Sequence, residues 1–321
     1  MISKKGDFNF VWLFAIIAGT AFLLLAIFFA VKFGGVLKTA GDTSVSKSLE
    51  ILTDPLQTGF VEAKTSKISF GVNTQLNPSC YDTGFGYHML STVTESDALK
   101  KNPPTPIEIK IPNKYIFAQQ SFGKDYYIFS KKFELGFPVA DMLFISTTEY
   151  CLVNPPLRIK EEIMGLNPPK IKIQDSENNT CSEKTTRVCF GYADNCNMTV
   201  SGTCFNSNEC KDQYETGTVS KDDGNVNYIG DLLYGAIFSN KDLYECNVKR
   251  LLYRTAQIAD TYYEKANLMD ARGCSTNLNA DLDSFSQQTI NATAQDLPTL
   301  FQVGKQLQMK KEAERGGCGV W

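Results

Sequence analysis

The sequence predicts an α+β protein with an N-terminal transmembrane helix, a disulfide-rich and mainly β ectodomain, and a long C-terminal α-helical hairpin. Three observations lead to this prediction: an uncharged apolar run near the N-terminus, ten cysteines that all follow this run, and a change from alternating to helical periodicity near residue 235. The 321 residues are enough for one large domain or two ordinary ones, and therefore for a sizeable hydrophobic core.

The composition excludes several classes of protein. Hydrophobic residues make up 43% of the chain and charged residues 21%, and the formal net charge is −3. This balance excludes an intrinsically disordered chain and a polybasic nucleic-acid-binding protein. The chain has a single histidine, His88, so a His-rich metal site is excluded and at most one catalytic centre depends on histidine.

The apolar run extends from Phe10 to Val31 and contains no charged residue. As an α-helix these 22 residues would be about 33 Å long, which is enough to cross the hydrocarbon core of a bilayer. Lys5 and Lys32 flank the run, and Trp12 lies near one end, where an indole favours the membrane interface. The run is therefore predicted to be a transmembrane helix.

A cleaved secretory signal peptide is the alternative for this run. Such a peptide has an apolar region of about 7–15 residues and small residues at positions −3 and −1 from the cut. For a cut after Ala30, the −3 position is the bulky Phe28. We therefore expect a retained signal anchor, in which residues 1–9 form a short cytoplasmic N-terminus, residues 10–31 cross the cell membrane once, and the C-terminal domain is extracytoplasmic.

The ten cysteines support this orientation. None forms a Cys-x-x-Cys pair, and an even number of cysteines without such a pair is typical of disulfides in an oxidising compartment. Five lie between residues 181 and 210, where large aliphatic residues are rare and cross-links are needed for order. A zinc site is the alternative, although structural zinc sites usually contain ligand pairs two to four residues apart. The disulfide candidates are Cys80, Cys151, Cys181, Cys189, Cys196, Cys204, Cys210, Cys246, Cys274 and Cys318.

Three Asn-x-Thr sequons also follow the apolar run, and they make Asn178, Asn197 and Asn291 candidates for N-glycosylation. Between the apolar run and the ectodomain, residues 32–64 are predicted to be a juxtamembrane linker with a short amphipathic helix, whose apolar face begins at Val45.

Residues 65–235 are predicted to be the strand-rich, Cys-rich ectodomain. In Ile107–Ile111 isoleucines alternate with charged residues, which is the period of a β-strand with one buried face. The alternation recurs at residues 170–173, and residues 126–129, 142–145 and 187–190 are predicted to be further strands.

Prolines divide this region. Three Asn-Pro-Pro triplets, at residues 102–104, 154–156 and 167–169, predict corners because proline cannot continue a regular element. Residues 156–165 are predicted to be a short helix that begins at a proline and ends at a glycine.

Residues 236–321 are predicted to be a helical hairpin packed on the ectodomain. Ser239–Asp242 resembles a capping box, and helical periodicity continues for about 33 residues to a stop at Gly273. A second helix over roughly residues 282–314, kinked at Pro298, would return antiparallel to the first.

The predicted first helix constrains two cysteines. Cys246 and Cys274 would lie near opposite ends of this helix and could not bond to each other while it is intact. Their partners are expected elsewhere, in the strand-rich region or at Cys318.

No motif assigns a catalytic, cofactor-binding or metal-binding residue. The chain contains no Walker A loop, no Rossmann glycine fingerprint, no Gly-x-Ser-x-Gly elbow and no His-Glu-x-x-His motif. Gly84 and Gly86 flank a phenylalanine just before His88, and we interpret this segment as an aromatic turn. His88 itself is then expected either on the surface or packed in the interior. Glu161 and Glu162 are adjacent on a predicted helix, so they point apart and are expected to be solvated.

The N-terminal segment Lys4-Lys-Gly-Asp-Phe-Asn-Phe-Val-Trp-Leu-Phe14 resembles an archaeal class III (type IV prepilin-like) start. In that family a prepilin peptidase cuts after the basic segment and leaves the apolar helix on the mature subunit, which implies a cut after Gly6. The sequence departs from the family at Val11, where many pilins have glutamate, and its ectodomain is larger and richer in cysteine than a typical archaeal pilin.

More broadly, the chain resembles uncharacterised single-pass membrane proteins of small-genome archaea. The resemblance rests on four segments spread over most of the chain, Asn9–Phe14, Leu52–Gln57, Tyr234–Ser239 and Cys246–Arg250. It implies no known activity and therefore no catalytic residues.

These observations predict a membrane-anchored extracytoplasmic protein that has a structural, adhesion or partner-binding role at the cell surface. We expect no catalytic activity, no cofactor and no metal. Its expected partners are the lipid bilayer, through Phe10–Val31, and a protein partner or further copies of itself, but not nucleic acid. One alternative is a type IV pilin-like subunit that assembles through its N-terminal helix, where Ala15 and Gly19 would allow helices to approach closely. A second alternative is a surface hydrolase that uses carboxylates.

Overall fold

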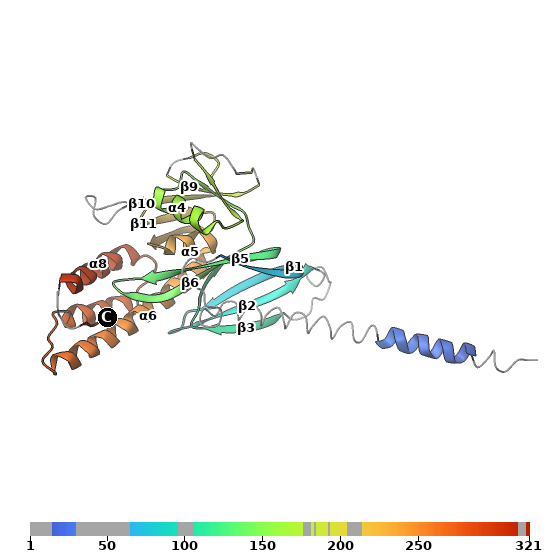
Figure 1. Ribbon diagram of the computed structural model, residues 1–321, viewed down its shortest axis with the longest axis horizontal. Coiled ribbons are helices and arrows are strands. Elements are labelled where there is room, and N and C mark those ends of the chain that lie inside the picture. Colours follow the sequence, from blue (N-terminus) through green and yellow to red (C-terminus); the bar gives the residue numbers. More distant parts are fainter. Residues whose placement is uncertain are drawn as a thin grey trace, which may run out of the picture.

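The computed structural model describes residues 15–29, 65–95, 106–175, 181–182, 184–191, 193–203, 214–313 and 319–321. Within these residues the protein is a mixed α+β structure with two six-stranded sheets, six helices and a helical C-terminal region (Figure 1). The predictions for residues 1–9, for the linker and amphipathic helix of residues 32–64 and for the first Asn-Pro-Pro triplet lie outside the described residues.

An α-helix covers residues 15–29, the described part of the predicted transmembrane segment. Its nine large apolar side chains are between 49% and 75% exposed. Residues 10–14, 30 and 31 of the predicted span lie outside the described residues. Among the helices that the structure describes, none has both the length and the apolar character that a membrane crossing requires.

The first sheet has the strand order β3-β2-β1-β5-β6-β4. Its neighbouring strands are antiparallel except for β4 and β6, which are parallel. The register between β1 and β5 shifts between Ser69 and Thr74, so β1 carries extra residues relative to β5 at this point. The strands are β1 (Ser66–Tyr81), β2 (Tyr87–Thr94), β3 (Ile107–Pro112), β4 (Tyr115–Ala118), β5 (Ser121–Glu134) and β6 (Pro138–Ser146).

The second sheet has the order β12-β11-β10-β9-β7-β8. The three strands β10, β11 and β12 are antiparallel, whereas β7 pairs in parallel with both β8 and β9, and β9 pairs in parallel with β10. Helix α4 (Leu157–Leu166) connects the parallel strands β7 and β8 and buries Ile159 and Ile163. The strands are β7 (Tyr150–Val153), β8 (Ile171–Gln174), β9 (Thr186–Phe190), β10 (Met198–Thr203), β11 (Thr216–Lys221) and β12 (Gly224–Ile229).

Four helices follow the last strand. They are α5 (Leu232–Phe238), α6 (Lys241–Asp270), α7 (Asn279–Thr289) and α8 (Leu297–Ala313). Helix α5 lies between the two sheets, and α6 extends from there along one side of the molecule, next to α7 (Figure 1). All seven residues of α5 are buried, which explains why this short segment is apolar on every side.

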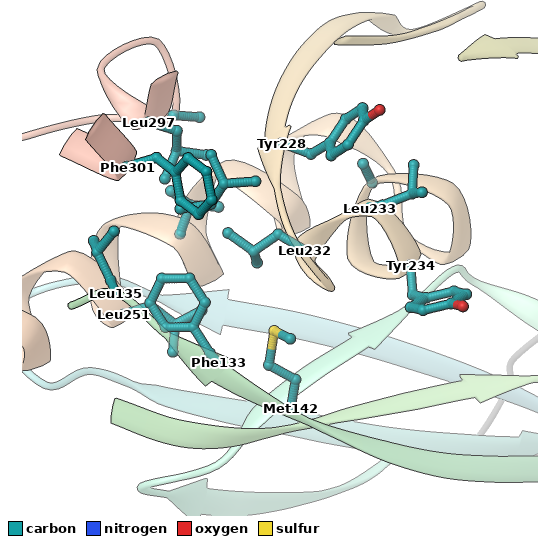
Figure 2. Close-up of a cluster of buried hydrophobic side chains, with 14 of the residues drawn as sticks. Phe133, Leu135, Met142, Tyr228, Leu232, Leu233, Tyr234, Leu251, Leu297 and Phe301 are labelled. Atoms are coloured by element: carbon teal, nitrogen blue, oxygen red, sulfur yellow. The ribbon is translucent and has the colours of Figure 1, made fainter. Parts of the chain in front are cut away.

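One hydrophobic core joins both sheets to the C-terminal helices. In Figure 2, Phe133 and Met142 of the β5–β6 hairpin, Leu232 of α5, Leu251 of α6 and Phe301 of α8 converge on a common interior. A smaller core cluster, which includes Ile116, Tyr126 and Ile128, lies on the opposite face of the first sheet, because successive strand residues point to opposite faces. Burial of one large apolar side chain stabilises the fold by about 1.5–3 kcal/mol, so this shared core holds the two sheets together.

The structure confirms the strands and corners that the sequence predicts within the described residues. The five predicted strand segments overlap β3, β5, β6, β8 and β9, and the predicted short helix is α4. Both described Asn-Pro-Pro triplets form corners, and their asparagines have left-handed backbones, with φ of 50° at Asn154 and 43° at Asn167.

The predicted two-helix C-terminal hairpin is wrong, because the second predicted helix is divided into α7 and α8. Residues 290–296 form a loop, in which Asp296 Oδ2 accepts a hydrogen bond from the backbone N of Thr293 at 2.9 Å. Pro298 does not kink a helix. It is the second residue of α8, where its missing N–H has no helical partner to lose.

The limits of the first C-terminal helix also differ from the prediction. The N-cap is Asn240, whose Oδ1 accepts a hydrogen bond from Leu243 N at 2.8 Å, and not Ser239, whose hydroxyl donates to Gly235 O at 2.7 Å. The helix ends at Asp270, so Cys274 lies beyond it. Gly273 occupies the turn after the helix with a φ of 83°.

Candidate functional site

The described cysteines form disulfides, as the sequence predicts. The bonds are Cys80–Cys246, Cys151–Cys181 and Cys189–Cys196, and Cys274 is also disulfide-bonded. Among the residues that the structure describes, no cysteine is free. Cys246 bonds to the strand-rich region and not to Cys274, which confirms the constraint predicted for these two residues. Cys204, Cys210 and Cys318 lie outside the described residues.

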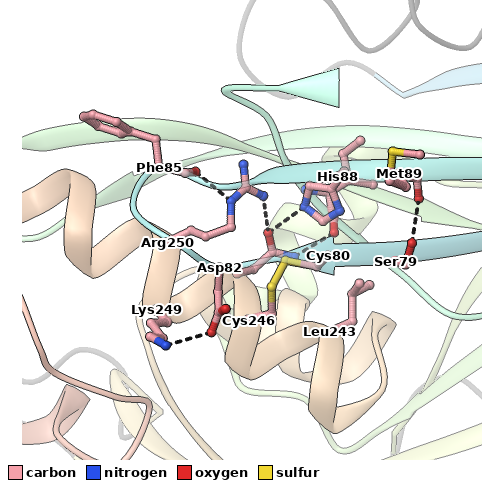
Figure 3. Close-up of a disulfide and its surroundings, with 12 residues drawn as sticks. Ser79, Cys80, Asp82, Phe85, His88, Met89, Leu243, Cys246, Lys249 and Arg250 are labelled. Atoms are coloured by element: carbon pink, nitrogen blue, oxygen red, sulfur yellow. Dashed lines mark hydrogen bonds and ion pairs between the residues drawn. A yellow bond between two sulfur atoms is a disulfide. The ribbon is translucent and has the colours of Figure 1, made fainter. Parts of the chain in front are cut away.

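The Cys80–Cys246 disulfide fastens α6 to the end of β1 (Figure 3). Beside it, Asp82 and Lys249 form an ion pair of 2.9 Å between the turn after β1 and α6. Cys80 also lies directly opposite His88 in the β1–β2 ladder. The disulfide and the histidine therefore belong to one junction between the first sheet and α6.

His88 is fully buried at this junction. Its Nε2 lies 2.7 Å from Asn247 Oδ1 and 3.1 Å from the backbone N of Ile116, and Asn247 Nδ2 donates to Ile116 O at 2.8 Å. Both backbone polar groups of Ile116, on the strand β4 at the edge of the sheet, thus meet side chains from β2 and α6. The histidine and the asparagine take the place of a neighbouring strand. They provide hydrogen-bond partners for backbone groups of the edge strand that would otherwise be buried without any.

Arg250 adds a buried charge to the junction. Its Nε donates to Phe85 O at 2.9 Å, and its guanidinium lies 4.9 Å from the centre of the Tyr115 ring. Burial lowers the pKa of Arg250 to about 10, so the side chain stays charged at neutral pH. Burial and this neighbouring charge lower the pKa of His88 to about 3, and the imidazole is therefore neutral. A neutral, enclosed imidazole suits a structural role.

A cavity of about 860 Å³ lies where the two sheets meet α8. The β5–β6 hairpin, α4, the turn after β12, α8 and the C-terminal Trp321 all contribute to its wall. Phe137 and Phe301 supply part of its apolar surface, and the Trp321 ring packs edge-on against Phe137 at 5.7 Å between centroids. This volume is within the range of about 300–1,000 Å³ that small-molecule sites occupy.

One end of the cavity carries a network of four charged side chains. Lys131 of β5 forms ion pairs with Glu162 of α4 and with Asp231, the latter at 3.5 Å. Arg158 of α4 lies 3.4 Å from the carboxylates of both Glu162 and Asp231. Tyr234 of α5 donates its hydroxyl hydrogen to Glu162 Oε2 at 2.9 Å. The network thus ties the first sheet to α4, α5 and the end of β12.

Burial raises the pKa of Asp231, and Lys131 and Arg158 oppose this shift. Burial and the neighbouring carboxylates raise the pKa of Tyr234 well above its usual value, so its hydroxyl remains a neutral donor. Two cations and two carboxylates give the network no net charge. It offers the cavity hydrogen-bond donors and acceptors in fixed positions.

The remaining candidates from the sequence lie on the surface or outside the described residues. Asn197 and Asn291 are exposed, as glycosylation requires, whereas Asn178 and Gly6 lie outside the described residues. Within the described residues, no group of three or more His, Cys, Asp or Glu side chains is placed to hold a metal ion.

Sequence reasoning missed the residues of the cavity. Lys131, Arg158 and Asp231 are far apart along the chain and belong to no motif, so no sequence signal marks them. Glu162 was expected to be solvated, but its side chain is only 15% exposed because Lys131 and Tyr234 cover it. A comparison of the chain with protein-family models, with curated proteins and with solved structures finds no significant match.

Proposed function

We propose that this protein is a membrane-anchored, extracytoplasmic binding or adhesion protein of the cell surface without catalytic activity. The disulfides carry the proposal, because such bonds form and persist in oxidising compartments. In this proposal residues 10–31 anchor the chain in the bilayer with the N-terminus in the cytoplasm. The large apolar side chains of residues 15–29 are exposed, which supports a lipid environment for this helix.

The architecture supports binding rather than catalysis. The disulfides and the shared core hold the two sheets and the C-terminal helices together, and the cavity offers a concave surface on them. In the charged network at one end of the cavity, the carboxylates Glu162 and Asp231 are engaged by Lys131 and Arg158. A third carboxylate, Glu215 of the cavity wall, is engaged by Lys305. A general acid–base pair would need carboxylates that are free to exchange protons with a substrate.

Single engineered cysteines test the topology. The native cysteines in the described part of the chain are disulfide-bonded. The unmodified chain gives the background labelling by a membrane-impermeant maleimide, including any from Cys204, Cys210 and Cys318, and labelling above that background reports the added cysteine. On intact cells we expect labelling of Lys310→Cys, whose side chain is 57% exposed, and no labelling of Ser3→Cys until the cells are lysed. The opposite pattern would refute the proposed orientation.

Glycosylation gives a second test. Asn291→Gln and Asn197→Gln should each lower the apparent mass of the protein by one glycan, because both asparagines are exposed. An unchanged mass in both variants would remove the glycoprotein part of the proposal and leave the topology to the labelling experiment.

The pilin-like alternative has one structural observation in its favour. Gly19 lies on the exposed helix of residues 15–29, and a Cβ added there would meet nothing within 4 Å, so a second helix could approach closely. Mass spectrometry of the mature N-terminus separates the alternatives. Asp7 as the first residue would favour a pilin-like subunit, and an intact Lys4–Lys5 segment would exclude prepilin-type processing.

The hydrolase alternative depends on Asp231, the carboxylate with a raised pKa in the cavity wall. If the protein is a hydrolase, Asp231→Asn should abolish turnover of a bound oligosaccharide, and the wild-type protein should produce shorter fragments. Recovery of the ligand intact from the wild-type protein would contradict this alternative.

A further inference from the structure

We propose that the cavity binds an uncharged, hydroxyl-rich ligand of the oligosaccharide class. The proposal rests on the proposed function, since it names what the ectodomain would bind. The volume of about 860 Å³ is appropriate for a few linked sugar rings.

The charge of the cavity wall favours an uncharged ligand. The wall contains both basic and acidic side chains, which nearly balance in number, so a polyanion or a polycation gains little from the overall field. The basic residues are Lys131, Lys132, Arg158, Lys305 and Lys311, and the acidic residues are Glu134, Glu215, Asp231 and Glu312.

The ion pairs in the wall favour hydroxyl groups in particular. Lys305 lies 3.0 Å from Glu215, and Asp231 lies within 3.5 Å of both Lys131 and Arg158. A charged ligand that displaced one partner of these pairs would leave a partly buried charge without its partner, which is costly. A hydroxyl both donates and accepts. Two neighbouring hydroxyls of a sugar can therefore donate to the carboxylate and accept from the cation while the ion pair stays intact.

Aromatic side chains supply the apolar part of the site. Trp321 stacks on Tyr262 at 5.4 Å between centroids, is partly exposed, and packs edge-on against Phe137. The largely buried rings of Phe137 and Phe301 also line the cavity. The C–H face of a sugar ring packs against such aromatic surface, while its hydroxyls reach the ion pairs. The cavity thus combines both kinds of contact that a neutral sugar makes.

The test uses the fluorescence of Trp321 in the full chain, solubilised in detergent micelles. The chain has two tryptophans, so Trp12→Phe leaves Trp321 as the only reporter. The probes are maltotriose, chitotriose and mannotriose, with a glucuronate-containing trisaccharide and the tripeptide Gly-Gly-Gly as comparison ligands. We expect at least one neutral trisaccharide to give a saturable change, confirmed by calorimetry, and to bind more tightly than either comparison ligand.

A matched pair of variants locates the site. Glu215→Gln removes the carboxylate that pairs with Lys305 and should weaken trisaccharide binding about tenfold, the loss of one charge-assisted hydrogen bond. Glu149→Gln breaks a similar exposed ion pair, to Lys170 at 2.7 Å, outside the cavity, and should change the affinity less than about twofold.

Three outcomes would overturn the proposal: no trisaccharide binds at millimolar concentration, the tripeptide or the glucuronate ligand binds more tightly, or the two variants behave alike. If any of these occurs while Lys310→Cys is still labelled on intact cells, only the ligand is refuted. If sugar binds but the labelling pattern is reversed, the membrane topology is refuted and the ligand is retained.

Discussion

Removal of the Cys80–Cys246 disulfide should destabilise the fold more than removal of the short Cys189–Cys196 disulfide. The first bond closes a sequence separation of 166 residues and the second a separation of seven. In the chain-entropy account, removing a disulfide increases the conformational entropy of the unfolded chain, and the increase grows with the logarithm of the number of residues in the loop that the bond closed. The relation gives a loss of about 5 kcal/mol for the long loop and about 2 kcal/mol for the short one at 25 °C.

The measurement is the free energy of unfolding of Cys80→Ala/Cys246→Ala and of Cys189→Ala/Cys196→Ala, from urea titrations followed by circular dichroism without reductant. Both variants remove two sulfur atoms. Cys189 is buried and the other three cysteines are half-buried, so any difference in lost packing would enlarge the loss for the short loop and oppose the expected order. We expect a difference of about 3 kcal/mol between the variants. Equal losses, or a larger loss for the short loop, would refute the view that the long-range bond stabilises chiefly by restricting the unfolded chain.

Three further predictions concern the junction and the core. Because the pKa of His88 is about 3 in the fold and about 6.5 when unfolded, its contribution to stability is complete above pH 6.5 and is lost as pH falls towards 3. Between pH 7.5 and 5 the free energy of unfolding of the wild-type protein should fall by about 2 kcal/mol more than that of His88→Gln. Equal dependence on pH in urea titrations of the two proteins would contradict this prediction. Gly86→Ala should lower the free energy of unfolding by more than about 2 kcal/mol, because φ is 56° at this position and the added Cβ would lie 1.9 Å from a backbone oxygen. Gly165→Ala is the control, and it should leave the stability unchanged or raise it slightly, because a Cβ added there meets nothing within 4 Å. Leu251→Ala should lower the free energy of unfolding by about 2–5 kcal/mol, because Leu251 is buried in the core. Leu268 is exposed on the same helix, so Leu268→Ala should lower it by less than about 1 kcal/mol. Thermal unfolding of each matched pair checks these values.

The elements that sequence reasoning predicted well have a local physical cause. Alternating side chains predicted the strand at Ile107–Pro112 because the period of two is set by the backbone alone. Proline likewise predicted the corners after Asn154 and Asn167, since it cannot continue a strand or a helix.

The C-terminal region shows where local rules were insufficient. The periodicity of residues 282–314 is compatible with one kinked helix or with two helices separated by a loop. The structure has two, because α7 and α8 each bury a separate apolar face, with Phe285 and Leu300 among the buried side chains. The choice depends on which surfaces are available for packing, and that information lies in distant parts of the chain.

The cavity could not be predicted for a related reason. Its charged network joins Lys131, Arg158, Glu162 and Asp231, which come from two elements and a turn. No spacing relates these residues, because their proximity results from the packing of two sheets against each other. Glu162 illustrates the difficulty, since the same position on a lone helix would be solvated.

The sequence by itself determined the features that depend on neighbouring residues or on composition: an α+β chain, strand positions, corners, the formation of disulfides and the expectation of an apolar N-terminal anchor. Only the tertiary structure decided the pairing of Cys80 with Cys246, the burial of the single histidine and the cavity between the sheets. The physical reason is that local preferences act over a few residues along the chain. Disulfide partners, buried polar contacts and cavities depend on which distant surfaces bury the most apolar area together.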